Sequence, residues 1–241
     1  MKRKILIIIA AVLTVSFVAF FFAYVGDYYK TDTAAVLSFS VKGDYSVNTD
    51  IEGMIVYEPE ETDTALIFYP GGKVEYTAYE PLMKLCAQKG VMCILLRMPF
   101  NLAVFDINAA KGICEKYPQI KNWYIGGHSL GGSMAAAHLA ENPDDFDGLI
   151  LLAAYSTSDL SDADVEVLSV YGSEDTVLNK EKYDECKSNL PQDFCERIID
   201  GGCHAYFGMY GEQEGDGSAT VTNEEQMNIT SKEIARFVGV N

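Results

Sequence analysis

The stretch that decides the fold is residues 121–141, KNWYIGGHSLGGSMAAAHLAE. Its first part, Trp123 to Ile125, is aromatic or β-branched and follows a polar turn, which is typical of a short buried strand. Its middle, Gly126 to Gly132, is dense in glycine, and its last part, Ser133 to Glu141, is rich in alanine and predicts a helix. Ser129 stands at the apex of the turn as G-x-S-x-G, so the stretch has the strand, sharp turn and helix of a nucleophile elbow.

The glycines of this turn have a physical role. A nucleophile held in a strained backbone region needs neighbours without a Cβ two positions before and after it, here Gly127 and Gly131. The helix that follows points its N-terminal N–H groups at the place where negative charge develops. The pattern therefore predicts that Ser129 is a nucleophile; a tight strand–helix turn with an idle serine is the alternative.

This stretch, together with those around Gly71, Asp175 and His204, resembles the α/β-hydrolase superfamily. The resemblance is strongest to compact, lidless members related to dienelactone hydrolases and small esterases, and it covers most of the chain from about Met54 onward. It implies an α/β fold with a mainly parallel sheet flanked by helices on both faces. It also implies a Ser-His-acid triad that requires no metal and no organic cofactor.

The acid of the triad is carried over by position. In the family it follows a strand in a G-x-x-D turn, and here the expected strand Val165 to Tyr171 runs into Gly172-Ser173-Glu174-Asp175. Asp175 takes the role, because a buried carboxylate at a strand end accepts the imidazole N–H and fixes the tautomer of the ring. Glu174 stays open as the neighbouring alternative.

The base is assigned to His204, which lies on a loop just past an expected strand, where the family places it. The chain has three histidines. His128 adjoins the nucleophile, but its place in the elbow does not let its ring reach the serine hydroxyl easily. His138 is nine residues into the elbow helix and too far along to return to the apex. A surface-loop histidine is the alternative for His204.

Two backbone N–H groups are expected to hold an oxyanion. One belongs to Leu130, directly after the nucleophile. In the family the second follows a buried strand, and that role is carried to Gly72 or Lys73, in the corner Pro70 to Val74. The match is partial, because the family often has histidine where Pro70 stands, and an ordinary tight turn is the alternative.

Apolar runs and helical patterns alternate along the rest of the chain, which predicts right-handed crossovers and a parallel sheet. The connection from Ala153 to Asp164 is about a dozen residues, too short for a lid, so the site is expected to be open. The capping box Thr222 to Glu225 predicts a terminal helix. Strands are expected at 53–57, 64–69, 91–96, 123–125, 146–152, 165–171 and 194–199, and helices at 79–89, 105–117, 133–141 and 180–189.

The N-terminus predicts a membrane helix. Lys2, Arg3 and Lys4 precede an uncharged run of 21 residues, Ile5 to Val25, which is long enough to cross a bilayer. The basic cluster predicts a cytoplasmic N-terminus and an extracytoplasmic catalytic domain at the cell membrane. The run is too long for a signal peptide and lacks a good small-x-small site, so an uncleaved signal anchor is favoured over secretion after cleavage.

The chain is expected to divide into an anchor at 1–26, a tether at 27–52 and a catalytic domain at 53–241. Residues 36–41 are interpreted either as an edge strand or as membrane-proximal packing. The loop Ala205 to Val221, which carries Tyr206, Phe207 and Tyr210, is either a wall of the substrate pocket or a packed connection.

Composition limits the partners. With 241 residues the chain has room for one ordinary catalytic domain, and its formal net charge is −17. That charge argues against nucleic acid, against polyanionic substrates and against electrostatic docking of the domain on anionic lipid. The six cysteines lack the spacing of a zinc site. Cys186, Cys195 and Cys203 are interpreted as a possible source of one disulfide, with the pair left open.

The sequence therefore predicts a carboxylesterase-like serine hydrolase with Ser129, His204 and Asp175 as its triad, acting on a small-molecule or lipid-like acyl ester. Two alternatives stay open. One is a serine peptidase or transacylase on the same fold, because the same acyl-enzyme can pass its acyl group to other acceptors. The other is a non-catalytic, membrane-tethered binding domain on a retired hydrolase scaffold.

Overall fold

A mostly parallel sheet of eight strands, in the order β1-β2-β4-β3-β5-β6-β7-β8, organises the chain. The computed structural model describes residues 2–240. Only the pairs β1–β2 and β2–β4 are antiparallel, so the predicted α/β fold with a mainly parallel sheet is confirmed. The strands are β1 (Tyr45–Asn48), β2 (Met54–Pro59), β3 (Thr64–Tyr69), β4 (Met92–Leu96), β5 (Asn122–His128), β6 (Gly148–Leu152), β7 (Glu166–Gly172) and β8 (Cys195–Ile199).

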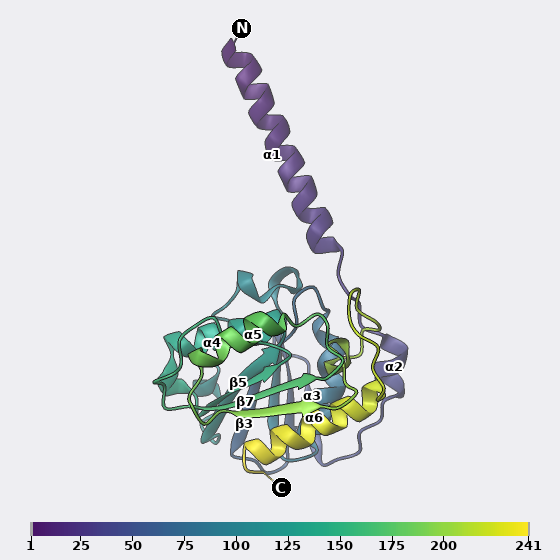
Figure 1. Cartoon of the computed structure of the whole chain (residues 1–241), viewed down its shortest axis with the longest axis vertical. Helices are drawn as coiled ribbons and strands as arrows, with labels where there is room; N and C mark the ends of the chain where they lie inside the picture. Colours follow the sequence, from purple (N-terminus) through teal and green to yellow (C-terminus); the bar gives the residue numbers. More distant parts are fainter. Residues whose placement is uncertain (1, 241) are drawn as a thin grey trace.

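Helices cover both faces of this sheet (Figure 1). The central strands β3, β4 and β6 are buried along their whole length, as their continuous apolar runs predict. One core contains Leu66 and Phe68 and packs under α3 (Glu80–Ala87) and α6 (Asn223–Phe237). The other contains Ala65 and Ile67 and packs under α4 (Leu130–Glu141). A further helix, α5 (Lys180–Cys186), lies between β7 and β8 in the chain.

The carboxyl ends of the parallel strands meet at one edge of the sheet. The segments that follow β3, β4, β5, β7 and β8 are therefore neighbours in space, although they come from distant parts of the chain. Between β6 and β7 the structure describes every residue and assigns neither helix nor strand, so the prediction of a fold without a lid domain is confirmed. The predicted capping box also forms, with Thr222 and Glu225 bonding each other's backbone.

The helix predicted at residues 105–117 is wrong. The chain there forms turns and two short 3-10 segments, at Ala103–Phe105 and Cys114–Lys116. The hydroxyl of Tyr69, on β3, donates to the Ile107 carbonyl at 2.8 Å and accepts from the Ala110 N–H at 3.0 Å. Gly112 then takes a positive φ of 73°. These backbone groups are thus held in a non-helical path by a side chain that lies far away in the sequence.

The edge strand considered at residues 36–41 is also wrong. Residues Thr33–Ser38 form the short helix α2, whose first turn is capped by Asp32 through a 3.0 Å hydrogen bond from the Ala35 N–H. The edge of the sheet is instead β1, a few residues later. All six cysteines, which lie within the described residues, are free thiols, so the considered disulfide is absent.

The N-terminal helix α1 (Lys2–Gly26) projects away from the domain, as Figure 1 shows. It contains one segment, Ile9–Gly26, that is long and apolar enough to cross a membrane, and this segment is almost wholly exposed. A membrane anchor and a signal sequence both fit this helix. The expected anchor therefore stays a prediction at this point.

Candidate active site

Ser129 lies in the turn between β5 and α4 with φ 52° and ψ −124°, a backbone conformation that non-glycine residues rarely adopt. The turn has no room for side chains on either side. A Cβ on Gly127 would lie 2.5 Å from the Tyr69 carbonyl oxygen, and one on Gly131 would collide with the carbonyls of Tyr69 and Pro70. The predicted strained elbow is thus present in the structure, and its apex presents the half-buried Ser129.

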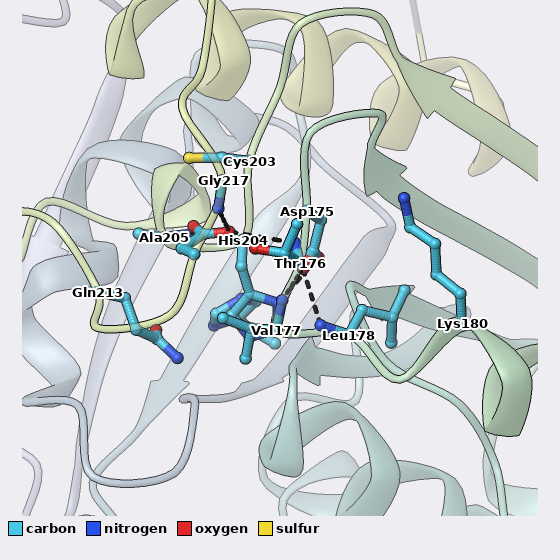
Figure 2. Close-up of polar contacts among 12 residues, drawn as sticks. Asp175, Thr176, Val177, Leu178, Lys180, Cys203, His204, Ala205, Gln213 and Gly217 are labelled. Atoms are coloured by element: carbon cyan, nitrogen blue, oxygen red, sulfur yellow. Dashed lines mark hydrogen bonds and ion pairs between the residues drawn. The ribbon is translucent and has the colours of Figure 1, made fainter.

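The side chains of Asp175 and His204 point toward one another (Figure 2). His204 Nδ1 lies 2.8 Å from Asp175 Oδ2, and both residues are almost completely buried. Asp175 Oδ1 accepts the N–H groups of Val177 at 2.9 Å and Leu178 at 2.8 Å. The carboxylate is therefore held in position by three bonds. The alternative acid Glu174 is exposed, and its carboxylate accepts instead from the hydroxyl of Ser173 at 2.9 Å.

The opposite nitrogen of the same ring, His204 Nε2, is buried and makes no hydrogen bond with the described part of the chain. An imidazole whose Nδ1 is bonded to a carboxylate has Nε2 available to accept a proton. Within residues 2–240, the Ser129 hydroxyl and His204 Nε2 are not joined by a hydrogen bond. Such contacts are often loose before substrate binds.

Two of the expected oxyanion donors, Leu130 and Gly72, belong to segments that pack against each other. Leu130 is the first residue of α4, so its N–H has no carbonyl partner within the helix. Gly72 packs against it, since a Cβ on Gly72 would lie 2.8 Å from Leu130 Cδ2. The N–H of Lys73, in contrast, donates to the Asn101 carbonyl at 2.7 Å. The prediction that Lys73 could be the second oxyanion donor is therefore wrong. Gly72 remains as the candidate for this role.

A family model described as alpha/beta hydrolase family matches residues 65–228. The chain belongs to this family. The match spans every segment of the site described above, from β3 to the loop after β8. No curated protein matches the chain significantly. The more specific likeness to dienelactone hydrolases stays a prediction.

The loop that carries His204 in this hydrolase is held by two side chains, Gln226 and Asp216, that sequence reasoning missed. Gln226, fully buried on α6, accepts the Cys203 N–H at 2.9 Å and donates to the Cys203 carbonyl at 2.8 Å. Asp216 accepts the Ala205 N–H at 2.8 Å. His204 is thus fixed on both sides by its neighbours' backbone bonds. The only signal in the sequence was the capping box, which placed Gln226 in a helix without indicating what it contacts.

A second pair of residues lies behind His204. The ring of His128 packs against that of His204 at a tilt of 49°, with centroids 4.6 Å apart. Its Nδ1 lies 2.8 Å from the Tyr79 hydroxyl, which also accepts the Gly71 N–H at 3.1 Å. The expectation that His128 is not the base agrees with this position. His128 and Tyr79 connect the loop after β3 to the predicted base, a role that sequence reasoning missed.

Burial lowers the pKa of His128 well below its usual value, and His204 lowers it further, while a backbone interaction with His204 opposes the shift only in part. The ring is therefore neutral in the folded hydrolase. Below pH about 6.5 the unfolded chain takes up a proton at His128 that the folded chain excludes, so the free energy of unfolding falls as the pH falls.

We expect His128→Gln to remove this contribution to acid sensitivity. The pH dependence of the free energy of unfolding below pH about 6.5 should become shallower by up to about 1.4 kcal/mol per pH unit, the slope that one proton gives. The measurement is urea unfolding of the full chain in detergent at several pH values from 7.5 to 4.5. Parallel curves for the variant and the parent would contradict a neutral, buried His128.

The loop after His204 is mainly a packed connection. Phe207 is fully buried with its ring 5.4 Å from that of His128, and Tyr210 packs on Tyr79 and Tyr29. Tyr206 lines a cavity of about 430 Å³ together with residues of α2, α6 and the same loop. This cavity contains none of the three predicted triad residues. Among the described residues, no cluster of His, Cys, Asp and Glu is arranged to hold a metal ion.

Proposed function

We propose that this chain is a serine acyl hydrolase that cleaves an ester bond through Ser129, His204 and Asp175. The observation that carries the proposal is the buried His204–Asp175 pair, with Nδ1 bonded at 2.8 Å and Nε2 without a partner in the described residues. The His204 ring packs against His128, the residue directly before the strained elbow serine. Membership of the α/β-hydrolase family supports hydrolysis in general. The ester bond and the triad are the specific claims of this proposal.

In the first half of the reaction, Ser129 Oγ attacks the ester carbonyl and its proton passes to His204 Nε2. The tetrahedral intermediate then expels the alcohol, which leaves with that proton, and an acyl-Ser129 ester remains. In the second half, water attacks this ester and gives a proton to His204 Nε2. The carboxylic acid leaves, and Ser129 recovers its proton. Asp175 stabilises the imidazolium in both halves.

The negative oxygen of each tetrahedral intermediate is placed between the N–H groups of Leu130 and Gly72. Both groups are fixed by the backbone before substrate arrives, so stabilising the charge needs no rearrangement at the moment of reaction. Losing one donor of this kind typically raises the barrier by about 3–4 kcal/mol. The positive end of α4 adds to the effect, because its N-terminus begins at the nucleophile.

We further propose that α1 stays attached as a membrane anchor, with Lys2 to Lys4 in the cytoplasm and the domain on the other side. The ring of Phe21, within α1, lies 5.4 Å from that of Phe100 and 6.0 Å from that of Phe105 in the domain. Cleavage of α1 as a signal peptide would remove these contacts from the folded domain, so they favour an uncleaved anchor. Protease treatment of intact cells tests the topology: digestion of the domain supports it, and full protection reverses it.

Product analysis tests the reaction. The purified full chain is expected to release acid and alcohol from a short-chain p-nitrophenyl ester, with water as the main acyl acceptor when a competing alcohol is added. Preferential transfer to the alcohol would instead favour a transacylase. Cleavage of a matched anilide without cleavage of the ester would favour a peptidase. A folded sample that cleaves neither the ester nor the anilide would favour the binding-domain alternative.

A further inference from the structure

The segment that follows α1 is hydrogen-bonded to the corner after β3. This corner lies at the edge of the sheet where the carboxyl ends of the parallel strands meet, which we call the catalytic edge. The Tyr29 N–H donates to the Lys73 carbonyl at 2.7 Å, and the Glu75 N–H donates to the Tyr29 carbonyl at 2.9 Å, so that Tyr29 pairs with Val74 as a short parallel bridge. An exposed ion pair joins Lys73 and Asp27 at 3.1 Å. Because these bonds involve the corner that contains Gly72, they hold the predicted oxyanion site next to the end of α1.

The loop 98–105, which follows β4, contacts α1 itself. Phe100 and Phe105 pack edge to face against Phe21 and against each other, with the last two centroids 5.7 Å apart. Despite these contacts, three side chains of the loop stay about half exposed, and we call them the apolar patch: Phe100 (47%), Val104 (43%) and Phe105 (50%). Exposed apolar side chains grouped in this way mark an interaction surface.

The inner side of the same loop lies at the predicted site. The Asn101 carbonyl accepts the Lys73 N–H at 2.7 Å, next to Gly72. Leu102 is almost fully buried, and its Cδ2 lies 3.6 Å from where a Cβ on Gly72 would be. The loop therefore carries the apolar patch on its outer side and contacts the segment of the expected oxyanion donor with its inner side. Whatever the patch touches lies close to the opening of the site.

The depth of Phe21 in α1 indicates what the patch touches. The apolar segment of the helix ends at Gly26, and Phe21 lies five residues earlier, about 7.5 Å further along the axis at 1.5 Å per residue. That depth matches the zone of about 5–10 Å in which interfacial apolar side chains are buried. Side chains that contact Phe21 are thus carried to the membrane surface. The formal charge of −17 means that apolar contact, and not electrostatic attraction, must hold them there.

We propose that the apolar patch rests in the bilayer surface from which α1 emerges, and that the site takes its substrate from this bilayer as a lipid-like ester with a long acyl chain. The choice of substrate rests on the proposed hydrolase function, whereas the position of the patch does not. The absence of a lid domain agrees with this arrangement, because the bilayer itself covers the opening of the site.

Fluorescence quenching tests the position without relying on activity. The full chain with Val104→Trp is placed in phosphatidylcholine vesicles with or without bromine on the acyl chains. Val47→Trp is the matched control, because Val47 is equally exposed (44%). Val47 lies on β1 and pairs with Tyr57 of β2. Tyr57 in turn pairs with Cys93, near the amino-terminal end of β4, so Val47 lies away from the catalytic edge.

Brominated lipid should quench Val104→Trp strongly and Val47→Trp no more than the parent chain, whose single tryptophan is Trp123. Equal quenching of the two variants, or none, would overturn the proposed position of the patch.

Turnover tests the route of the substrate. The rate on a long-chain p-nitrophenyl ester dissolved in the vesicles is divided by the rate on p-nitrophenyl acetate in water. A charge in the patch weakens apolar contact with the bilayer, so Val104→Asp should lower this ratio about tenfold or more. Val47→Asp, with the same change in net charge, should not lower it.

Equal ratios for the two variants, with both esters cleaved, would overturn the bilayer route and leave the hydrolase standing. A protein that cleaves neither ester would overturn the proposed function and with it the lipid-like substrate. The quenching result would still decide where the patch lies.

Discussion

Replacing Ser129 by alanine is expected to lower ester turnover by about 10⁴-fold or more, because the variant has no nucleophile to form the acyl-enzyme. Any turnover that remains comes from binding and the oxyanion donors alone. The measurement is kcat/KM on a short-chain ester for the purified full chain. The backbone at this position is already strained in the parent, and alanine adds no new atoms, so thermal unfolding should change little.

Ser133→Ala is the matched control for this variant. Ser133 lies four residues later on α4, and its hydroxyl donates to the Tyr155 carbonyl at 2.7 Å, outside the proposed chemistry. This control should retain turnover within a few-fold. Turnover at the parental rate in Ser129→Ala, or equal losses in the two variants, would contradict the assignment of Ser129.

The second large effect is expected for Asp175→Asn. The amide oxygen can still accept the N–H groups of Val177 and Leu178, so the turn keeps its shape. The amide nitrogen then donates to His204 Nδ1, which favours the tautomer that carries its proton on Nε2. That tautomer cannot take the proton of Ser129, and the expected loss in kcat/KM is on the order of 10⁴-fold.

Glu174→Gln is the control, because it removes the neighbouring carboxylate from an exposed position. It should change kcat/KM less than twofold while both variants keep the parental unfolding temperature within a few degrees. The reverse pattern, with a large loss for Glu174→Gln and none for Asp175→Asn, would assign the acid to Glu174.

The parts of the fold that the sequence predicted are those that depend on local pattern. The strand 64–69 has the predicted bounds because its six residues, five of them apolar, suit a strand buried on both faces. The elbow followed from the glycines on either side of Ser129, whose close backbone contacts leave no alternative residue type.

The errors arise where a distant side chain decides the local structure. Residues 105–117 have a helical pattern, but the Tyr69 hydroxyl holds two of their backbone groups. The Lys73 N–H fits the local pattern of an oxyanion donor, but it donates to the Asn101 carbonyl at 2.7 Å. Sequence reasoning also missed Gln226 and Tyr79, because only the tertiary fold brings these two side chains to the site.

The central claim is that Ser129 is the nucleophile of a working triad. The measurement that tests it most directly is reaction of the full chain with a fluorophosphonate probe, followed by mass spectrometry to locate the adduct. The account predicts one adduct per chain, on Ser129, lost in Ser129→Ala and strongly slowed in Asp175→Asn. A folded sample that does not react, or one that carries the adduct on another residue, would contradict it.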